Sequence, residues 1–369
     1  MMKFTVDKKE MMTAIKEASK AVSANNPFKA LEALKVTVAE NSVALTGYDI
    51  EMSITENLDA ATQDHGEFLI NTKLVNNILK TMPNGKINFT LDENINLTIS
   101  ADNTDFEVPA MSADEYPEVP TALDADNPIV ISAEKLKPMI DETIYAVSNN
   151  DLKPTLTGEL FELKDGILTI VSIDGFRMAV KREKLNTENT AYFIVPAKAT
   201  KELTAQLKGY DGNVEIYHTE KHTTFKFGNA EISVRLIGGE FHRYEGSIPY
   251  DASTEIIIDT EKTIKALEQC KLLLNEKNKC PLVCKFENGV LEMACKTGIG
   301  KFNKTMAVDQ SGQDIRIGFK ASYLYEALKN INTKQAVIGM NGACKAVKVT
   351  PQGSTGETIH IVMPLQIRD

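Results

Sequence analysis

The sequence predicts an α+β protein built from three copies of one unit, in which an antiparallel sheet is covered by two helices. A β-branched strand that runs through a polar cap into an amphipathic helix occurs three times, with caps Asp7, Ser132 and Asp259 spaced by 125 and 127 residues. A second strand-to-helix segment recurs at nearly the same interval, with Phe68, Phe193 and Ile317 at equivalent positions.

Three domains of about 120 residues follow from this repeat, at residues 1–121, 128–248 and 250–369. Segments rich in proline, aspartate and small residues separate them, near 120–128 and 247–254. With 369 residues, of which 43% are hydrophobic, each domain can bury a core of its own.

Six helices are expected, at residues 7–23, 71–82, 132–148, 196–208, 259–276 and 320–331. Apolar residues recur in them at intervals of three and four, as at Leu74, Ile78 and Leu79, which predicts one face packed on a sheet. The segments between them alternate in polarity like strands, with hairpin turns at Glu40-Asn41, Asp165-Gly166 and Asn288-Gly289.

Charge is divided along the repeat. The chain has a net charge of -10, which taken alone argues against nucleic-acid binding, but the six helical segments carry +4 and the remainder -14. Lysines share faces of the predicted helices: Lys9, Lys16 and Lys20; Lys73 and Lys80; Lys198, Lys201 and Lys208; Lys262 and Lys265. Such faces are typical of solvated helices, and their recurrence also suits contact with phosphates, which lysine binds as a point charge.

No pattern predicts catalysis, a cofactor or a metal. His218 and His222 are four apart, but the alternation around them indicates a β-hairpin with a turn at Glu220-Lys221 instead of a zinc-binding helix. Cys280 and Cys284 lack a matching second pair, so we expect buried thiols. Five cysteines confined to the last third of the chain favour a reducing cytoplasm, and no apolar run approaches the ~20 residues of a membrane span.

Seven stretches of the sequence stand out, in order: LTGYDIEM at 45–52, VPAMSADEYPEVP at 108–120, KPTLTGELFEL at 153–163, SIDGFRMAV at 172–180, FHRYEGSIP at 241–249, FKASYLYEAL at 319–328 and the terminal IVMPLQI. In these stretches the sequence resembles the bacterial DNA sliding clamps, the beta subunits of DNA polymerase III. The resemblance implies clamp-type domains and a head-to-tail homodimer that closes into a ring around duplex DNA.

It also implies a non-catalytic, cytoplasmic processivity subunit that binds double-stranded DNA without reading its sequence. The lysines above would then face DNA, together with Lys29, which substitutes for the arginine of the family's usual loop in the departing segment KALEAL at 29–34.

A further implication is a protein-binding pocket for short Gln/Leu/Phe motifs of the polymerase III catalytic subunit, the clamp loader and repair polymerases. The matching residues are Leu156, Ile173, Gly175, Phe176, Arg177, Met178, His242, Ser247, Tyr323, Ala346, Ile361, Val362, Met363, Pro364 and Leu365. Phe176, Met178, His242 and Ser247 depart from the family's frequent residues, so the preferred partner motif stays open while the pocket itself is still expected.

The dimer seam implied by the family brings Phe106 and Val108 of one copy against Leu272 and Leu273 of the other, an apolar set that would otherwise be exposed. Two other functions stay open: a protein-binding scaffold that does not encircle DNA, and an enzyme without a recognisable motif.

Overall fold

The computed structural model describes residues 1–369 except 24–25, 151, 275–279, 355–356 and 368–369. It divides into two compact units, one of residues 1–134 with 205–236 and the other of residues 135–204 with 237–369. Both units take part of the predicted central domain, so the limits 1–121, 128–248 and 250–369 stay a prediction. Among the described residues, no helix has the length and apolarity that a membrane crossing requires.

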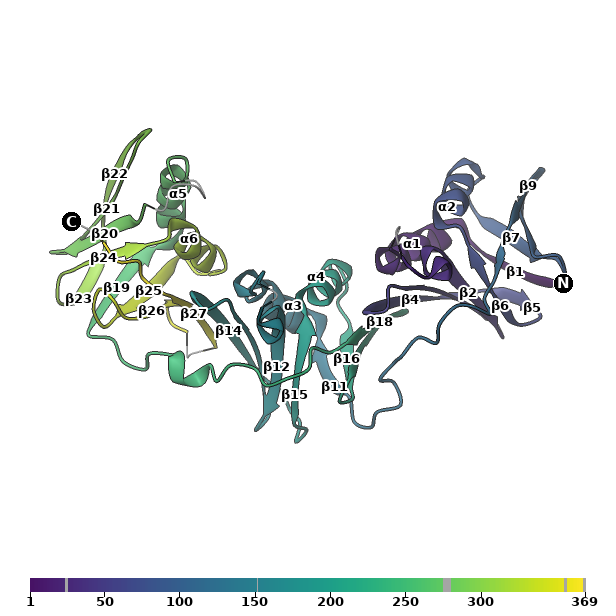
Figure 1. Cartoon of the computed structure of the whole chain (residues 1–369), viewed down its shortest axis with the longest axis horizontal. Coiled ribbons are helices and arrows are strands. Elements are labelled where there is room, and N and C mark those ends of the chain that lie inside the picture. Colours follow the sequence, from purple (N-terminus) through teal and green to yellow (C-terminus); the bar gives the residue numbers. More distant parts are fainter. Residues whose placement is uncertain (24–25, 151, 275–279, 355–356, 368–369) are drawn as a thin grey trace. The chain divides into compact units, whose positions relative to one another are not determined.

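The first unit holds two antiparallel sheets (Figure 1). The five-stranded sheet has the order β5 (Ala61–Gln63), β1 (Met2–Asp7), β7 (Lys86–Leu91), β8 (Asn96–Ala101), β9 (Thr104–Pro109). The nine-stranded sheet has the order β10 (Met111–Ser112), β6 (Gly66–Ile70), β2 (Leu34–Ala39), β3 (Ser42–Tyr48), β4 (Met52–Asp59), β18 (Ala230–Arg235), β17 (His222–Phe227), β16 (Asn213–His218), β11 (Ile129–Ser132).

The second unit repeats this plan with a nine-stranded and a four-stranded antiparallel sheet. The larger has the order β15 (Ala191–Pro196), β12 (Gly158–Lys164), β13 (Ile167–Ile173), β14 (Arg177–Lys184), β27 (Thr358–Val362), β26 (Val347–Pro351), β25 (Gln335–Met340), β19 (Thr254–Asp259), β23 (Asp309–Gly312). The smaller has the order β22 (Gly300–Ala307), β21 (Val290–Thr297), β20 (Leu282–Glu287), β24 (Ile315–Phe319).

Two helices accompany each repeat, as predicted: α1 (Lys8–Ala18) and α2 (Thr72–Thr81), α3 (Ala133–Asp141) and α4 (Ala197–Gln206), α5 (Thr260–Lys271) and α6 (Ala321–Lys329). The Asp7 carboxylate accepts from the Lys9 amide at 2.8 Å, and Asp259 accepts from the Lys262 amide at 2.9 Å, so both predicted caps are confirmed. Ser132 directly precedes α3, and its capping role stays a prediction.

All six helices are somewhat shorter than the sequence predicts, and three of them end well before their predicted limits. Helix α1 tightens into a 3-10 turn at Ser19–Ala21, and α5 ends at Lys271, while residues 275–276 of that prediction lie outside the described residues. Helix α3 ends at Asp141, where the Thr143 hydroxyl donates to the Met139 carbonyl at 2.7 Å and the Thr143 amide turns to the Ile140 carbonyl instead. A separate 3-10 turn follows at Ile144–Ala146.

The core of the first unit corrects one predicted position. Val75, Ile78, Leu79 and Met82 of the α2 segment are buried, whereas Leu74, predicted to face the core, is 40% exposed. The buried stripe follows positions i, i+3, i+4 and i+7, so Leu74 falls at its margin. Strand β3 approaches α1 so closely that a Cβ on Gly47 would lie 2.1 Å from the Ala18 carbonyl oxygen, which only glycine avoids.

All three predicted hairpin turns are confirmed. β2 joins β3 through Asn41 at φ 57°, β12 joins β13 through Asp165 and Gly166, and β20 joins β21 through Asn288 and Gly289, all in the left-handed region. His218 and His222 lie at the two ends of the turn between β16 and β17, so this segment is the hairpin that the alternation predicted.

Strand pairing extends beyond the predicted domains, which the sequence did not indicate. Within the first unit β4 pairs with β18, and within the second β14 pairs with β27, in register from Arg177 opposite Val362 to Lys181 opposite Thr358. Successive repeats therefore share sheets instead of only touching through loops.

A buried carboxyl group lies in the second unit on β12. Glu159 is fully buried, and its Oε1 lies 2.7 Å from the Thr143 hydroxyl and 3.3 Å from the Ser172 hydroxyl. Burial raises its pKa to about 7, although the hydroxyls of Thr200, Thr143 and Ser172 oppose the shift. The protonated acid can donate to Thr143, which in turn donates to the Met139 carbonyl.

We predict that Glu159→Gln flattens the pH dependence of stability. Between pH ~4.5 and ~7 the unfolded chain has released this proton and the folded chain keeps it, so the free energy of unfolding falls as pH rises. Urea unfolding should show equal stability of both proteins at pH 4 and a variant more stable by roughly 2–3 kcal/mol at pH 8. Glu220→Gln, at an exposed turn, is the control, and parallel pH curves for wild type and Glu159→Gln would contradict the prediction.

Candidate functional site

The lysines predicted to face DNA lie at the surface of their units. All eleven are exposed, on the helices or beside them. Lys8, which also belongs to the predicted 7–23 segment, is instead buried, and its Nζ donates to the Met82 carbonyl at 2.5 Å. The net charge of a helical segment therefore overstates the positive charge that the segment presents to solvent.

Ion pairs divide ten of these eleven lysines into two groups. Five lie near carboxylates of their own segment: Lys16 and Lys20 beside Glu17 at 3.0 and 2.6 Å, Lys29 beside Glu32 at 3.1 Å, Lys262 beside Asp259 at 3.2 Å and Lys265 beside Glu261 at 2.5 Å. Five make no ion pair within the described part of the chain: Lys9, Lys73, Lys80, Lys201 and Lys208. Exposed pairs are weak, so the first group can exchange its partners for phosphates at small cost.

Residues predicted to form the peptide pocket gather in the second unit. Leu156, Ile173, Met178 and Ile361 belong to one buried cluster, and Ala346 packs against it. Val362 does not join them, because alternation along β27 directs its side chain into the core of α5 and α6. His242 and Ser247 are exposed, while their neighbours Phe241 and Ile248 enter the cluster.

Above this cluster lies a surface that we call the apolar patch: Phe176, Tyr323, Met363, Pro364 and Leu365. Phe176 is 59% exposed and its ring lies 6.4 Å from that of Tyr323. The Met363 amide donates to the Phe176 carbonyl at 2.8 Å, and the Leu365 amide donates to Gly318. Backbone bonds to the β13–β14 turn and to β24 thus hold the C-terminal segment in place.

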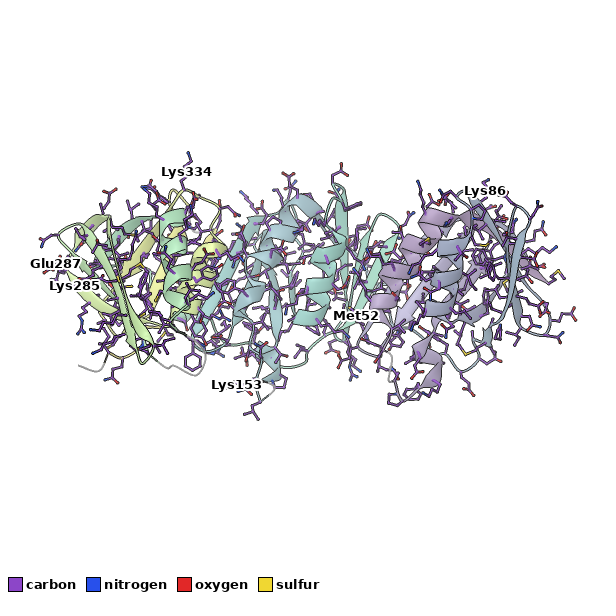
Figure 2. All side chains as sticks on the ribbon, turned by 90° about the horizontal axis from the view of Figure 1, so that it is seen from above. Met52, Lys86, Lys153, Lys285, Glu287 and Lys334 are labelled. Carbon is purple, nitrogen blue, oxygen red and sulfur yellow. The ribbon has the colours of Figure 1, made fainter. Side chains whose placement is uncertain are left out.

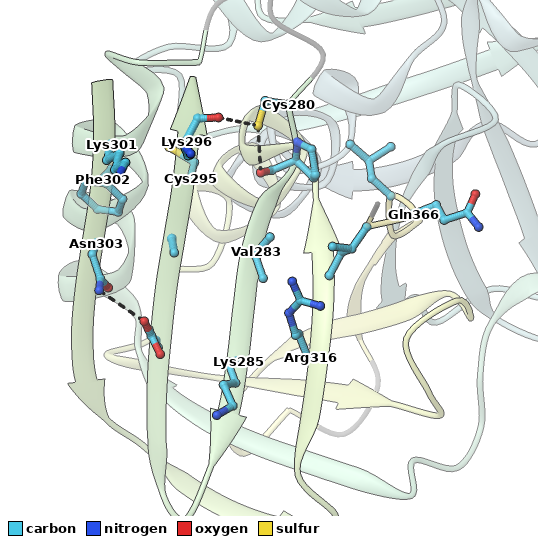
Figure 3. A pocket seen from close by; sticks show the side chains of 15 residues that line it. Cys280, Val283, Lys285, Cys295, Lys296, Lys301, Phe302, Asn303, Arg316 and Gln366 are labelled. Atoms are coloured by element: carbon cyan, nitrogen blue, oxygen red, sulfur yellow. Dashed lines mark hydrogen bonds between the residues drawn. The ribbon is translucent and has the colours of Figure 1, made fainter. Parts of the chain in front are cut away.

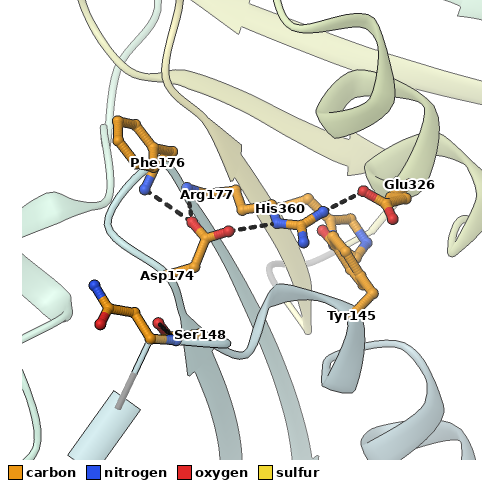
Figure 4. Close-up of polar contacts among 8 residues, drawn as sticks. Tyr145, Ser148, Asp174, Phe176, Arg177, Glu326 and His360 are labelled. Carbon is orange, nitrogen blue, oxygen red and sulfur yellow. Dashed lines mark hydrogen bonds and ion pairs between the residues drawn. The ribbon is translucent and has the colours of Figure 1, made fainter. Parts of the chain in front are cut away.

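The turn between β13 and β14 positions Phe176. Gly175 has φ 90°, and the Asp174 carboxylate accepts from the Phe176 and Arg177 amides at 2.9 and 3.0 Å (Figure 4). This turn directs Phe176 outward and Arg177 toward α6.

Arg177 joins β14 to α6. Its Nε lies 2.9 Å from Asp174 and its Nη1 pairs with Glu326, while its guanidinium stacks 4.6 Å from the Tyr323 ring and 5.3 Å from the Tyr145 ring (Figure 4). With 10% of its side chain exposed, Arg177 supports Tyr323 more than it offers itself to a ligand.

Beneath Arg177, Tyr145 Oη lies 2.9 Å from Nδ1 of His360. Burial lowers the pKa of His360 to about 3 and raises that of Tyr145, so both groups are neutral at physiological pH. Sequence reasoning missed Tyr145, Asp174, Glu326 and His360. Only Asp174 carried a local signal, as an aspartate opening a turn before glycine.

Three of the four predicted seam residues are less exposed than expected. Phe106 and Val108 on β9 pack against the core of the first unit, and Leu273 packs against the core around α5 in the second. Leu272, in contrast, is 80% exposed. Both β9 and β22 are edge strands of their sheets.

These features define a protein of repeated two-helix α+β domains with joined sheets. Models of the N-terminal, central and C-terminal domains of the DNA polymerase III beta subunit match residues 2–120, 130–243 and 246–366. The chain therefore belongs to the DNA polymerase III beta subunit family.

Individual relatives agree in length and fold. The chain is similar to the beta sliding clamp of Halalkalibacterium halodurans, with 28% identity covering 99% of this chain and 100% of that protein. It also resembles the crystal structures of a DNA polymerase III beta subunit from Eubacterium rectale, at 25% identity and a TM-score of 0.93, and of the Bacillus subtilis sliding clamp, at 24% and 0.94, each covering 100% of both chains.

We predict that Arg177→Met destabilises the chain by about 2–3 kcal/mol, because Asp174 and Glu326 lose their shared cation and two rings lose their stacking partner. The midpoint of urea unfolding measures this loss. Arg243→Met is the matched control, since that side chain is 91% exposed and lies 3.7 Å from Glu240, and we expect a change below ~0.5 kcal/mol. Equal midpoints for the two variants would contradict the structural role of Arg177.

Proposed function

We propose that the chain is a DNA sliding clamp, a non-catalytic subunit of the bacterial cytoplasm, two copies of which close into a ring around duplex DNA. The observation that carries the proposal is the match of all three beta-subunit domains, in order, over nearly the whole chain. Lysines on the helices of an otherwise acidic protein support it.

Contact with DNA is expected to be weak and independent of sequence. Lysines without an ion pair in the described part of the chain, such as Lys73 and Lys201, can contact DNA phosphates and release their counterions. None of the helical segments carries an arginine to read base edges. Processive movement then depends on closure of the ring instead of tight binding.

Edges of two sheets support ring closure. Strands β9 and β22 each leave one row of backbone groups without a strand partner in the described chain, and such edges readily pair with another chain. Asp105 and Glu107 are exposed on β9, whereas Lys301 and Lys304 are exposed on β22. Opposite charges on the two edges favour head-to-tail pairing of β9 with β22 of a second copy.

The apolar patch fits the partner motifs. Phe176 and Met363 expose apolar surface beside Tyr323, and the backbone of the C-terminal segment is already anchored, so a short Gln-Leu-x-Leu-Phe peptide can bury its leucine and phenylalanine there. The polymerase III catalytic subunit, the clamp loader and repair polymerases would carry this motif.

The ring is tested by loading the protein onto nicked circular DNA with a bacterial clamp loader and ATP, followed by gel filtration. We expect the protein to remain on the circle and to leave when the DNA is linearised. Leu272→Asp should yield monomers in sedimentation and abolish retention, because it places a carboxylate in the seam without disturbing the monomer.

Leu152→Asp, at a residue 88% exposed, is the control for added charge. Leu273→Asp is a poorer test, since Leu273 packs on its own core. Retention after linearisation, or no retention on intact circles, would instead support a scaffold that does not encircle DNA.

For the patch, Met363→Glu should weaken binding of a fluorescent Gln-Leu-x-Leu-Phe peptide at least tenfold, because a carboxylate would meet the peptide's apolar anchors. Fluorescence anisotropy measures the affinity. Met111→Glu is the control, because it changes a comparably exposed methionine on β10. This variant should bind the peptide with the affinity of the wild type. Unchanged affinity in Met363→Glu would place the binding surface elsewhere.

A further inference from the structure

Two buried cysteines meet between helix α5 and the four-stranded sheet β22-β21-β20-β24. Cys270 belongs to the last turn of α5 and Cys295 to β21, 25 residues later, and their sulfur atoms lie 3.4 Å apart. Both side chains belong to the core around α5 and α6. The end of the helix and the sheet beside it therefore touch through two thiols.

Alternation along the strands separates these thiols from the charged side of the sheet. On β20, Cys284 enters the core, whereas Lys285 and Glu287 face outward, where their side chains pair at 2.5 Å (Figure 2). On β21, Cys295 also enters the core, but it borders an open groove on the outer face (Figure 3) and is 5% exposed. Cys270 is fully covered, so Cys295 is the member of the pair nearer to solvent.

The other three cysteines have different surroundings. Cys284 is fully buried, as predicted, and burial raises the pKa of its thiol to about 12. Cys280 is only half-buried, which corrects the prediction of a buried thiol, and its sulfur donates to the Lys296 carbonyl at 3.1 Å (Figure 3). Cys344 is exposed. Among the described cysteines, only the first pair has its two sulfurs in hydrogen-bond contact.

The contact gives the two sulfurs different roles. The Cys270 thiol donates its hydrogen to the Cys295 sulfur, and burial together with this bond raises the pKa of Cys270. Cys270 therefore keeps its proton, while Cys295, which receives the hydrogen bond, is positioned to react first. A disulfide needs the sulfurs about 1.4 Å closer together, a movement that rotation about χ1 of both side chains can cover.

We propose that Cys270 and Cys295 are a redox-sensitive pair, which a hydroperoxide converts into a reversible disulfide that fastens the end of α5 to β21. In the first step the Cys295 thiolate attacks one oxygen of hydrogen peroxide. The O–O bond breaks, the departing hydroxide takes up a proton to become water, and Cys295 becomes a sulfenic acid.

In the second step the Cys270 sulfur attacks the sulfur of Cys295. The S–O bond breaks, and the hydroxide leaves with the Cys270 proton as a second water. The two thiols have then lost two electrons and two protons, and the peroxide has been reduced to two waters. In a reducing compartment such a disulfide is transient, so the pair would sense oxidant instead of serving as a permanent cross-link.

The cross-link would fix the chain where α5 ends. Leu272, next but one after Cys270, is exposed, and Leu273 packs on the core beside β22, where a Cβ on Gly300 would lie 3.4 Å from its side chain. Neither cysteine lies on the β22 edge, so formation of the disulfide goes beyond the sliding-clamp function and does not depend on it.

The test treats full-length wild type, and the variant Cys280→Ser with Cys344→Ser, with hydrogen peroxide. The double variant removes the two cysteines that are not buried. Remaining thiols are then alkylated, and the chain is digested without reductant for mass spectrometry. In both proteins we expect one link between the peptides that carry Cys270 and Cys295, and full reversal of this link by dithiothreitol.

Further substitutions in the double variant identify the pair. Cys295→Ala should abolish the link, whereas Cys284→Ala, the matched control at another buried cysteine of the same core, should keep it. Formation of the link should raise the midpoint of thermal unfolding by ~3 °C or more, because it joins residues 25 positions apart and restricts the unfolded chain. Dithiothreitol should return the midpoint to its starting value.

Several results would overturn the proposal. They are alkylation of both Cys270 and Cys295 after peroxide treatment, a link from Cys295 to Cys280 in place of Cys270, and a link that forms only when urea has unfolded the chain. A link that leaves the thermal midpoint unchanged or lowers it would equally overturn the fastening of α5 to the sheet.

Discussion

Backbone pairing between β14 and β27 is the interaction on which the candidate protein-binding surface depends. It places Arg177 opposite Val362 and Met178 opposite Ile361, and it brings the C-terminal segment to within hydrogen-bond distance of Phe176. Without this ladder the apolar patch would be two separate segments, one on a turn and one near a chain end. Because each repeat leaves a sheet edge, pairing with the next repeat satisfies backbone groups that would otherwise be unpaired.

Arg177 extends the same contact from backbone to side chains. Its guanidinium lies between two tyrosine rings and two carboxylates, so β14 and α6 are linked by charge, stacking and hydrogen bonds at once. Planar geometry allows arginine to satisfy all of these partners, which lysine cannot do. Arg177, which was expected to bind ligands, therefore mainly supports Tyr323. The burial of Arg177 makes this surface rigid.

Charge in this chain is arranged on two scales. At the scale of segments, positive charge collects on the helices and negative charge elsewhere, which suits a protein that contacts a polyanion over limited surface. At the scale of residues, carboxylates one to four positions away pair with several of those lysines.

Local interactions explain what the sequence by itself determined. Caps at Asp7 and Asp259, the three left-handed hairpin turns and the repeat of paired helices depend on residues a few positions apart, so their pattern was legible before the structure. Contacts across long sequence separations decided the rest: the burial of Lys8 against Met82, the exposure of Leu74, the inward direction of Val362, and the pairing of β14 with a strand some 180 residues later. A periodic pattern in the sequence shows which apolar or charged residues are neighbours on the same helix or strand. Only the packed chain determines which distant group it meets, because backbone pairing and burial join segments that carry no local sign of each other.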